Sequence, residues 1–240
     1  MVLAFDAIVI AQSSCSDTLT LVLRHAKRFR QCALRRPCSP FDQPPRSLFP
    51  MKFCSECAHP VSFVVPPDDN RPRYVCTHCG VIHYQNPKMV IGSIPVWQCE
   101  GEVSVLLCKR AIEPRHGYWT LPAGFMENNE TTADAAVRET TEEAGARIEL
   151  HPLFSLLNVA HVHQVHMFYR ASLLDLNYAA GTESLEVKLF TEADIPWDDI
   201  AFPTVSQTLK LFFSDTQKVQ HGGEYGFHTH DILKSMRNPD

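Results

Sequence analysis

Apolar, β-branched runs separated by polar turns dominate residues 88–190. Two of these runs, MVIGSIPVW and VSVLLCKR, flank the turn-forming residues Glu100–Glu102, a pattern that predicts a β-hairpin over residues 88–110. Similar patterns predict further strands at Leu153–Val159, Gln164–Leu174 and 183–190. The predicted sheet therefore takes its strands from both sides of a central segment.

That central segment, residues 121–148, reads LPAGFMENNETTADAAVRETTEEAGARI and follows the period of a helix. Small side chains recur at i, i+3, i+4, i+7 and i+11, which makes one narrow face suited to close packing on a sheet. These positions are Ala133, Ala136, Val137, Thr140 and Ala144. Gly145 follows where a helix end requires positive φ, so the helix is predicted to end there.

A second helix is predicted at Pro203–Phe213, after the last strand. Strands on either side of a central helix, together with a closing helix, predict a mixed α/β sandwich. The segment from Glu224 to Asp240 carries no clear signal for a helix or a strand.

Three glutamates of the central helix, Glu139, Glu142 and Glu143, are spaced i, i+3 and i+4. This spacing projects them from one helix face, beside the packing face and not within it. Like charges at this spacing destabilise a helix unless a cation neutralises them, and Mg²⁺ prefers carboxylate and phosphate oxygens. A solvated acidic face is the alternative, but it does not explain the loop that precedes the helix.

Four cysteines form two Cys-x2-Cys pairs, Cys54/Cys57 and Cys76/Cys79, separated by eighteen residues. Each pair presents two thiolates from a tight turn, and two turns complete a tetrahedron around Zn²⁺. Disulfides or a redox-active pair are the alternatives, but no secretory signal supports disulfides and a redox motif needs a single pair. Because four cysteine ligands leave no open position, the zinc site is predicted to be structural.

Residues 1–50 carry a net charge of +4, whereas residues 51–240 carry −9. The Arg-rich, acid-poor composition of the first segment resembles an organelle transit peptide. A disordered extension, or upstream sequence absent from the functional protein, is the favoured interpretation, with Met51 as the functional start. Mass spectrometry of the native N-terminal peptide would test this. No apolar run approaches the ~18 residues that span a membrane, and the acidic body argues against a general nucleic-acid-binding surface.

Within residues 121–148, charged and glycine residues stand at fixed spacing. They are Gly124, Glu130, Arg138-Glu139, Glu142-Glu143 and Gly145-Ala146. This pattern resembles the signature box of the Nudix hydrolases, and Thr140 is the one departure, because the family prefers an aliphatic residue there. The resemblance implies an α/β fold, the Nudix α/β/α sandwich with a mixed β-sheet, preceded by a small zinc ribbon with four cysteine ligands.

The resemblance also implies a reaction. Nudix enzymes hydrolyse a diphosphate linked to another group, with water attacking phosphorus and Mg²⁺ or Mn²⁺ assisting. It assigns Glu139 and Glu143 as the principal metal ligands, and Glu142 to a second metal ion or to the positioning of water. The carbonyl of Ala123 is implied as a backbone ligand.

Arg138 is expected to pair with Glu130, which clamps the loop to the helix and supports catalysis indirectly. A further ligand or general base is expected from outside the box. The zinc-ribbon branch places a glutamate before an aromatic-ending strand, and LEVKLF points to Glu186, with Glu183 as the runner-up. An exposed polar residue of a strand is the alternative for both. The candidate substrate contacts are Tyr84, Arg110, Arg115 and Trp119. The two aromatic residues are equally well explained by packing.

The order of zinc ribbon, HYQNPK and Nudix domain resembles the NADH pyrophosphatases. Those enzymes carry Ser-Gln-Pro-Trp-Pro-Phe-Pro shortly after the box, whereas this chain reads FSLLNVAHVHQVHMF there. The shorter zinc-ribbon members, linked with ADP-ribose and FAD pyrophosphohydrolysis, are the better match. The predicted reaction is therefore cleavage of a nucleoside diphosphate derivative, ADP-ribose or FAD, with release of AMP. An NADH or NAD-cap pyrophosphatase and a catalytically silent nucleotide-binding module are the alternatives.

The implied cofactors are catalytic Mg²⁺ or Mn²⁺ and structural Zn²⁺. The expected partners are a small dinucleotide or nucleotide-sugar substrate and a second copy of the chain in a homodimer, with no membrane and no nucleic acid other than a capped RNA end. The expected location is cytoplasmic, or an organelle if residues 1–50 are a transit peptide. The expected organisation is an extension at 1–50, a ribbon and link at 51–87, a Nudix domain at 88–215 and a tail at 216–240.

Overall fold

The computed structural model describes residues 51–233, and the chain divides into two compact units between Tyr84 and Gln85. The predictions for residues 1–50 and for the end of the tail, 234–240, lie outside the described residues. Within residues 51–233, no helix is long and apolar enough to cross a membrane.

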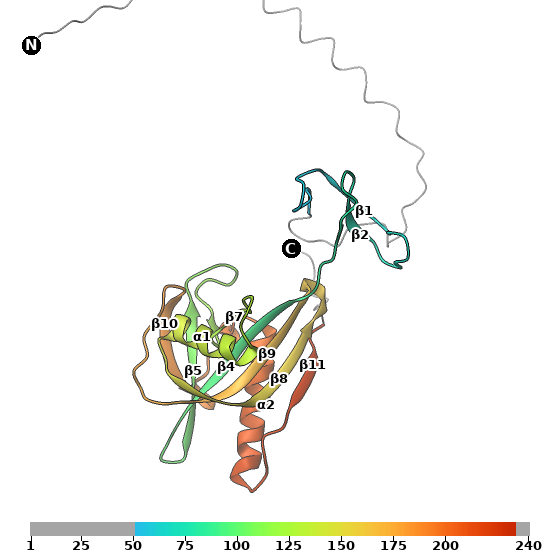
Figure 1. Ribbon diagram of the computed structural model, residues 1–240. Helices are drawn as coiled ribbons and strands as arrows, with labels where there is room; N and C mark the ends of the chain where they lie inside the picture. Colours follow the sequence, from blue (N-terminus) through green and yellow to red (C-terminus); the bar gives the residue numbers. More distant parts are fainter. Residues whose placement is uncertain (1–50, 234–240) are drawn as a thin grey trace, which may run out of the picture. The chain divides into compact units, whose positions relative to one another are not determined.

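The first unit contains a small antiparallel sheet with the strand order β1-β2-β3 (Figure 1). Its strands are β1 (Val61–Val64), β2 (Arg73–Cys76) and β3 (Ile82–His83). Tyr74 is buried, and its ring packs against Phe63 of the facing strand with 4.9 Å between ring centroids. Because a unit of this size has little apolar core, its stability depends on additional links such as bound metal.

The second unit is built around an eight-stranded mixed sheet. Its strands are β4 (Lys88–Cys99), β5 (Glu102–Arg110), β6 (Trp119–Thr120), β7 (Ala123–Phe125), β8 (Ile148–Val159), β9 (Gln164–Leu173), β10 (Ser184–Thr191) and β11 (His228–Asp231). The continuous order is β10-β5-β4-β9-β8-β11, with β6 paired to β5 and β7 paired to β4. The β4–β9 and β8–β11 pairs are parallel, and the other pairs are antiparallel.

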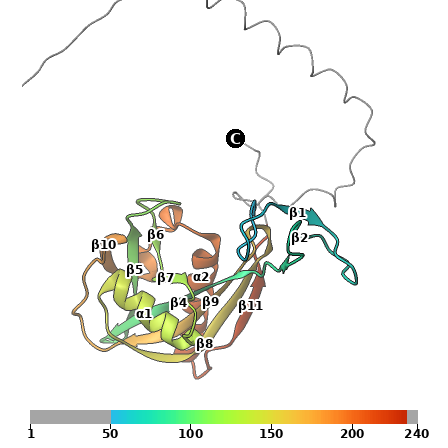
Figure 2. The ribbon, with the colours of Figure 1, turned by 45° about the horizontal axis from the view of Figure 1, so that its top comes forward.

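Two α-helices, α1 (Thr132–Ala144) and α2 (Pro203–Gln220), cover opposite faces of this sheet (Figure 1 and Figure 2). Successive side chains of a strand point to opposite faces. Ile91 of β4 accordingly packs with alanines of α1, whereas Ile94 packs with Phe212 of α2. The structure therefore confirms the predicted α/β/α sandwich. Short 3₁₀ helices lie in the connections: η1 (Ala160–Val162), η2 (Glu192–Asp194) and η3 (Trp197–Asp199).

The β4–β5 hairpin has the form that the sequence predicts. Its turn consists of Glu100 and Gly101, with φ of 51° and 86°, between the paired residues Cys99 and Glu102. Two positive φ angles are typical of the type I′ turn, whose twist matches that of the flanking strands. Glu102, predicted within the turn, is the first residue of β5.

Other element boundaries differ from the prediction. β8 begins at Ile148, earlier than the predicted strand, and α2 continues past Phe213 to Gln220. The helix continues because Asp215 and Thr216 remain buried, at 1% and 7% exposure. The strand β11 was not predicted, because HTHD shows no apolar alternation and its side chains are mostly exposed. Backbone pairing with β8 defines it instead.

Candidate active site and zinc site

The four cysteines of the first unit converge on one point. Sγ of Cys54 lies 3.7 Å from Sγ of Cys79, and Sγ of Cys57 lies 3.4 and 3.5 Å from those of Cys76 and Cys79. Four thiolates about 2.3 Å from a tetrahedral Zn²⁺ stand about 3.8 Å apart, so this arrangement fits that ion. Backbone N–H groups of Cys79 and His78 donate to Sγ of Cys76 and lower the pKa of its thiol to about 6, which favours the metal-binding thiolate.

Each cysteine pair is held by its own backbone turn, and the two turns have the same hydrogen-bond pattern. The N–H of Ala58 donates to the carbonyl of Cys54 at 3.0 Å, and the N–H of Gly80 donates to the carbonyl of Cys76 at 3.2 Å. Ala58 and Gly80 both have positive φ, at 59° and 75°. Two segments distant in sequence therefore present their thiolates in the same way.

In the second unit, two glutamates of α1 belong to its buried face. Glu139 and Glu143 are 8% and 6% exposed, whereas the Glu142 side chain is 59% exposed. The prediction that all three lie beside the packing face is wrong for the first two. The buried face packs on β4 and β7, and it includes Ala135, which is fully buried beside Ile91 of β4, whereas Val137, predicted to pack, is 39% exposed.

The backbone of β7 makes this burial possible. A Cβ atom at Gly124 would collide with the carboxylate of Glu139, so that carboxylate can keep its position only if residue 124 has no side chain. One residue earlier, the N–H of Ala123 donates to Oε2 of Glu143 at 3.1 Å. The carboxylates of Glu139 and Glu143 thus both lie close to the backbone of β7.

Burial disfavours the ionised form of both carboxylates. It raises the pKa of Glu143 to about 8 and also raises the pKa of Glu139, against the opposing effects of Ala123 N–H and Arg138. Because a cation replaces the hydration that buried carboxylates lose, such a pair favours a bound ion with a preference for oxygen ligands. Glu139 and Glu143 would hold this ion, with Glu142 and the Ala123 carbonyl as additional candidates.

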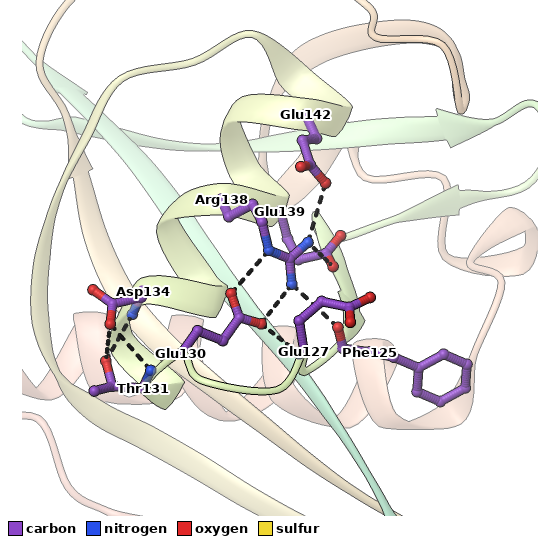
Figure 3. A network of polar contacts seen from close by, with 8 residues as sticks. All are labelled: Phe125, Glu127, Glu130, Thr131, Asp134, Arg138, Glu139 and Glu142. Carbon is purple, nitrogen blue, oxygen red and sulfur yellow. Dashed lines mark hydrogen bonds and ion pairs between the residues drawn. The ribbon is translucent and has the colours of Figure 1, made fainter.

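Arg138 joins the loop to the helix (Figure 3). Its Nε and Nη2 donate to the two carboxylate oxygens of Glu130 at 2.9 and 2.7 Å, and Nη2 donates to the Phe125 carbonyl at 3.1 Å. Its Nη1 donates to Glu139 at 2.7 Å and to Glu142 at 3.1 Å. The hydrogen bonds from Arg138 lower the pKa of Glu130 to about 2, so Glu130 stays charged. The Arg138–Glu130 contact predicted from the sequence is present; its effect on activity stays a prediction.

The ends of α1 are fixed by two caps. At the start, Thr131 Oγ1 accepts from the N–H of Asp134 at 3.1 Å, and Asp134 Oδ2 accepts from the N–H of Thr131 at 3.0 Å. This capping box was missed, although its Thr-x-x-Asp spacing is visible in the sequence. At the end, Gly145 has the predicted positive φ, 59°, and its N–H donates to the carbonyl of Thr141 at 2.9 Å.

The segment before β10 brings Glu183 to the C-terminal end of α1. The N–H groups of Ala179 and Gly181 donate to the carbonyls of Ala144 and Glu143 at 2.9 and 3.0 Å. The chain then passes Glu183, whose negative charge contributes to the raised pKa of both buried helix glutamates. Glu183 therefore acts on the same carboxylate pair from outside the box.

Glu186 occupies a different environment. It lies on β10 with a half-exposed side chain, and its Oε2 is 4.0 Å from Nζ of Lys109. Of the two glutamates singled out in the sequence, it is Glu183 whose charge raises the pKa values of the helix carboxylates. Which of the two supplies the further ligand or general base stays a prediction.

Arg110 ends β5, just before a loop that contributes residues to a pocket of about 510 Å³. Its charge acts to lower the pKa of Glu143, its Nε donates to the carbonyl of Pro114 at 2.9 Å, and its guanidinium lies over the ring of Phe202. The pocket is lined from the β5–β6 loop, η3 and α2, with polar residues Arg115, Tyr118, Asp198, Ser206, Gln207 and Lys210. Its volume is typical of a small-molecule site. The residues from η3 and α2 carry no motif, which is why the sequence analysis missed them.

The remaining predicted substrate contacts have different surroundings. Trp119 is 8% exposed and meets Phe190 edge-on, with 4.8 Å between ring centroids, which is the packing alternative of the sequence analysis. Tyr84 belongs to the first unit, is 64% exposed and has the guanidinium of Arg73 over its ring at 5.1 Å. Arg115 lines the pocket.

Comparison with known proteins agrees with this fold and with the zinc ribbon. The family described as "NUDIX domain" matches residues 87–207, and "Nudix N-terminal", a zinc ribbon, matches residues 52–85. The protein belongs to the Nudix hydrolases and carries the zinc-ribbon domain of one branch, in a family that uses divalent metal ions.

Similar proteins include the NAD-capped RNA hydrolase NudC of Salmonella paratyphi C (strain RKS4594), 32% identical over 170 residues, which are 69% of this chain and 60% of the relative. The NudC of Salmonella heidelberg (strain SL476) is 33% identical over 98 residues, 41% of this chain and 35% of the relative. The chain thus spans between 35% and 60% of the length of these curated relatives. A crystal structure of a NUDIX hydrolase from Nitrosomonas europaea is 50% identical, covers 77% of this chain and 100% of its own, and superposes with a TM-score of 0.71.

Proposed function

We propose that this enzyme hydrolyses the diphosphate of a nucleoside diphosphate joined to a second group, with ADP-ribose or FAD as substrate and AMP as product. The observation that carries the proposal is the pair of buried glutamates, Glu139 and Glu143, held against the backbone of Gly124. Such a pair suits Mg²⁺ or Mn²⁺, and these ions bind diphosphate oxygens together with carboxylates.

Each residue of this site has a distinct proposed role. A bound ion would offset charge on the diphosphate and activate water. Glu139 and Glu143 would hold that ion, and the exposed Glu142 would add a second ion or position water. Arg138 orients Glu139 through its hydrogen bond at 2.7 Å. Glu183 is proposed, ahead of Glu186, to accept a proton from the attacking water, because the segment before it is hydrogen-bonded to the carbonyls of Glu143 and Ala144 at the end of α1.

The pocket lined by Arg115 is proposed to hold the group beyond the diphosphate. Arg115 and Lys210 supply positive charge at its wall, and Arg110 supplies positive charge that acts on Glu143; both suit phosphate oxygens. Asp198 and Gln207 line its wall and offer hydrogen-bond partners to a ribose or a ring nitrogen.

NAD-capped RNA is the second candidate substrate, because the relative named for that activity is 32% identical over 69% of this chain. The sequence after the box speaks against it. Where the NADH pyrophosphatases carry a proline-rich motif, this chain forms the regular strands β8 and β9, joined by η1. ADP-ribose and FAD therefore remain the favoured substrates.

The proposal is tested by incubating the purified protein separately with ADP-ribose, FAD, NADH and NAD-capped RNA, each with Mg²⁺, with Mn²⁺ and with a chelator. We expect metal-dependent AMP release, with a higher kcat/KM for ADP-ribose or FAD than for NADH. Faster cleavage of NAD-capped RNA would favour the second candidate. Binding without hydrolysis of any of the four would favour a silent nucleotide-binding module.

Two further properties belong to the proposal. The resemblance to zinc-ribbon relatives supports a homodimer, which a monomer mass in light scattering would contradict. The proposed location is the cytoplasm, or an organelle if residues 1–50 act as a transit peptide, and imaging of the full chain with a C-terminal tag distinguishes the two.

A further inference from the structure

The ribbon carries two exposed histidines beside its cysteines, one from each turn. His59 follows Cys57, and His78 lies between the two cysteines of the second pair. Their imidazole rings are stacked, with 3.9 Å between centroids and 7° between ring planes. One nitrogen of each ring and Sγ of Cys57 all lie within 4.8 Å of one another. Three donor atoms that suit zinc therefore converge beside the four-cysteine site.

The ring of His59 is held by the backbone of the first cysteine turn. Its Nδ1 lies 2.9 Å from the carbonyl oxygen of Cys57, so Nδ1–H donates to that oxygen and Nε2 keeps its lone pair. Metal-binding histidines are commonly fixed by such a hydrogen bond from the other ring nitrogen. This contact leaves Nε2 available to bind a metal ion.

Electrostatics favours a cation at this place. One Zn²⁺ bound by four thiolates leaves a formal charge of about −2. Cys79 is exposed and Cys57 is half-buried, so part of this charge reaches the surface. A thiolate sulfur bound to one ion keeps further lone pairs, and it can therefore bridge to a second ion.

We propose that His59 and His78, with Sγ of Cys57 as a shared ligand, form a second site for a divalent transition-metal ion of the zinc class. The ion has two nitrogen ligands, one bridging sulfur and water as the fourth ligand. Two nitrogens about 2.0–2.1 Å from a tetrahedral zinc stand about 3.4 Å apart. Because each imidazole binds a metal ion in its own ring plane, the two nearly parallel rings would have to tilt so that their nitrogen edges converge on the ion. This second site has fewer protein ligands than the four-cysteine site, and one of them is shared. It therefore binds its ion more weakly and fills second.

Zinc content of the full chain tests this proposal. Wild type, the paired variant His59→Ala/His78→Ala and the control His161→Ala/His163→Ala are dialysed against buffered free Zn²⁺. Saturating Mg²⁺ is present so that the glutamates of α1 are occupied. The control removes two exposed histidines of the second unit. We expect wild type and control to hold one more zinc ion per chain than the paired variant, which keeps the ion of the four cysteines.

Cadmium-113 NMR identifies the ligands. We expect two resonances in wild type, one from a sulfur-only site and one from a site with nitrogen ligands, and loss of the second alone in the paired variant. Equal zinc content in wild type and the paired variant, or a single resonance in wild type, overturns the proposal. If the paired variant also loses the cysteine-bound ion, the single variants decide: each must lose the nitrogen-ligated resonance and retain the other, or the proposal fails.

Discussion

At the scale of single residues, the proposed chemistry depends on Glu143. Its carboxylate is 6% exposed, accepts one hydrogen bond from Ala123 N–H at 3.1 Å, and has its pKa raised to about 8 by burial. A charged form in this position is costly without a cation. Glu142 of the same helix is exposed to solvent, whereas Glu143 is buried. This burial distinguishes a metal site from an ordinary acidic surface.

We predict that Glu143→Gln lowers kcat by ~100-fold or more while the fold survives. The substitution keeps the shape of the side chain and removes the charge that holds the metal ion, and a 100-fold change corresponds to about 2.7 kcal/mol of lost transition-state stabilisation. Metal-dependent AMP release from ADP-ribose or FAD is the measurement. Glu139→Gln should behave in the same way.

Glu127→Gln is the matched control for this prediction. Glu127 lies in the same loop and is exposed, and its backbone N–H, which donates to Glu130 at 2.6 Å, is retained in the variant. We expect little loss of activity. Equal losses in the Glu127 and Glu143 variants would show that α1 is not the metal site.

Gly124 supports a second prediction at this scale. Because a Cβ there would collide with the carboxylate of Glu139, we expect Gly124→Ala to displace that carboxylate and raise the Mg²⁺ concentration needed for half-maximal activity by about tenfold. A Mg²⁺ titration of the hydrolysis rate is the measurement. An unchanged titration curve would show that Glu139 does not need this approach to bind the ion.

At the scale of elements, each helix is tied to the sheet by a buried pair of hydroxyl groups. Ser93 of β4 and Thr140 of α1 are 2.6 Å apart, and Ser155 of β8 and Thr208 of α2 are 3.2 Å apart. Thr140 Oγ1 also donates to the carbonyl of Ala136 at 2.7 Å. These contacts explain how a threonine is accommodated where the family prefers an aliphatic residue.

A double-mutant cycle tests the first of these pairs. We expect Thr140→Val to cost about 1–3 kcal/mol of unfolding free energy, because it leaves the buried Ser93 hydroxyl without its partner, and Ser93→Ala to cost less. The double variant should cost less than the sum. Thr141→Val, at an exposed position of the same helix, is the control. Additivity within about 0.5 kcal/mol would show that the two hydroxyls are not coupled.

The α2–β11 connection is held by the buried carboxylate of Asp215. Burial disfavours its charged form, but Lys218 at 2.7 Å, His228 at 2.7 Å and the N–H of Gly226 at 2.9 Å outweigh this effect and lower its pKa from 3.8 to about 2. A carboxyl whose pKa is lower in the folded state stabilises the fold above its unfolded pKa. That contribution is lost as the pH falls from about 4 toward 2.

We therefore predict a pH-dependent effect of Asp215→Asn. The variant should have a smaller unfolding free energy than wild type at neutral pH, and the difference should shrink between about pH 4 and pH 2. Urea unfolding at a series of pH values is the measurement. Asp194→Asn, at an exposed position, serves as the control. A difference that stays constant down to pH 2 would contradict the assigned pKa.

The sequence predicted those elements whose pattern is local. The hairpin turn at Glu100–Gly101 and the helix end at Gly145 follow from short-range backbone requirements, and both are present. The burial of Glu139 and Glu143 could not be predicted from helical period, because it depends on how closely β7 approaches α1. The strand β11 could not be predicted either, because its pairing with β8 does not depend on its side chains.

At the scale of the whole molecule, two compact units rely on different sources of stability. The second has an extended apolar core on both faces of its sheet, including Phe154, Phe168 and Phe212. The first has few buried apolar residues and exposes Phe53, Val64 and Val65 by 61%, 46% and 53%. Zinc bound by the four cysteines is therefore expected to supply much of the folding free energy of the ribbon.

We predict that Cys76→Ser releases the structural zinc and unfolds the ribbon selectively. Cys76 is 2% exposed, and its Sγ accepts two backbone N–H groups, so the substitution removes a ligand from an ordered position. Because metal binding and folding are coupled in small zinc sites, amide protons of residues 54–80 should lose protection from hydrogen exchange while those of the eight-stranded sheet keep it. Cys99→Ser, an exposed cysteine of the second unit, is the control. Retention of zinc by the Cys76 variant, or an equal loss of protection in both units, would contradict a structural zinc site confined to the ribbon.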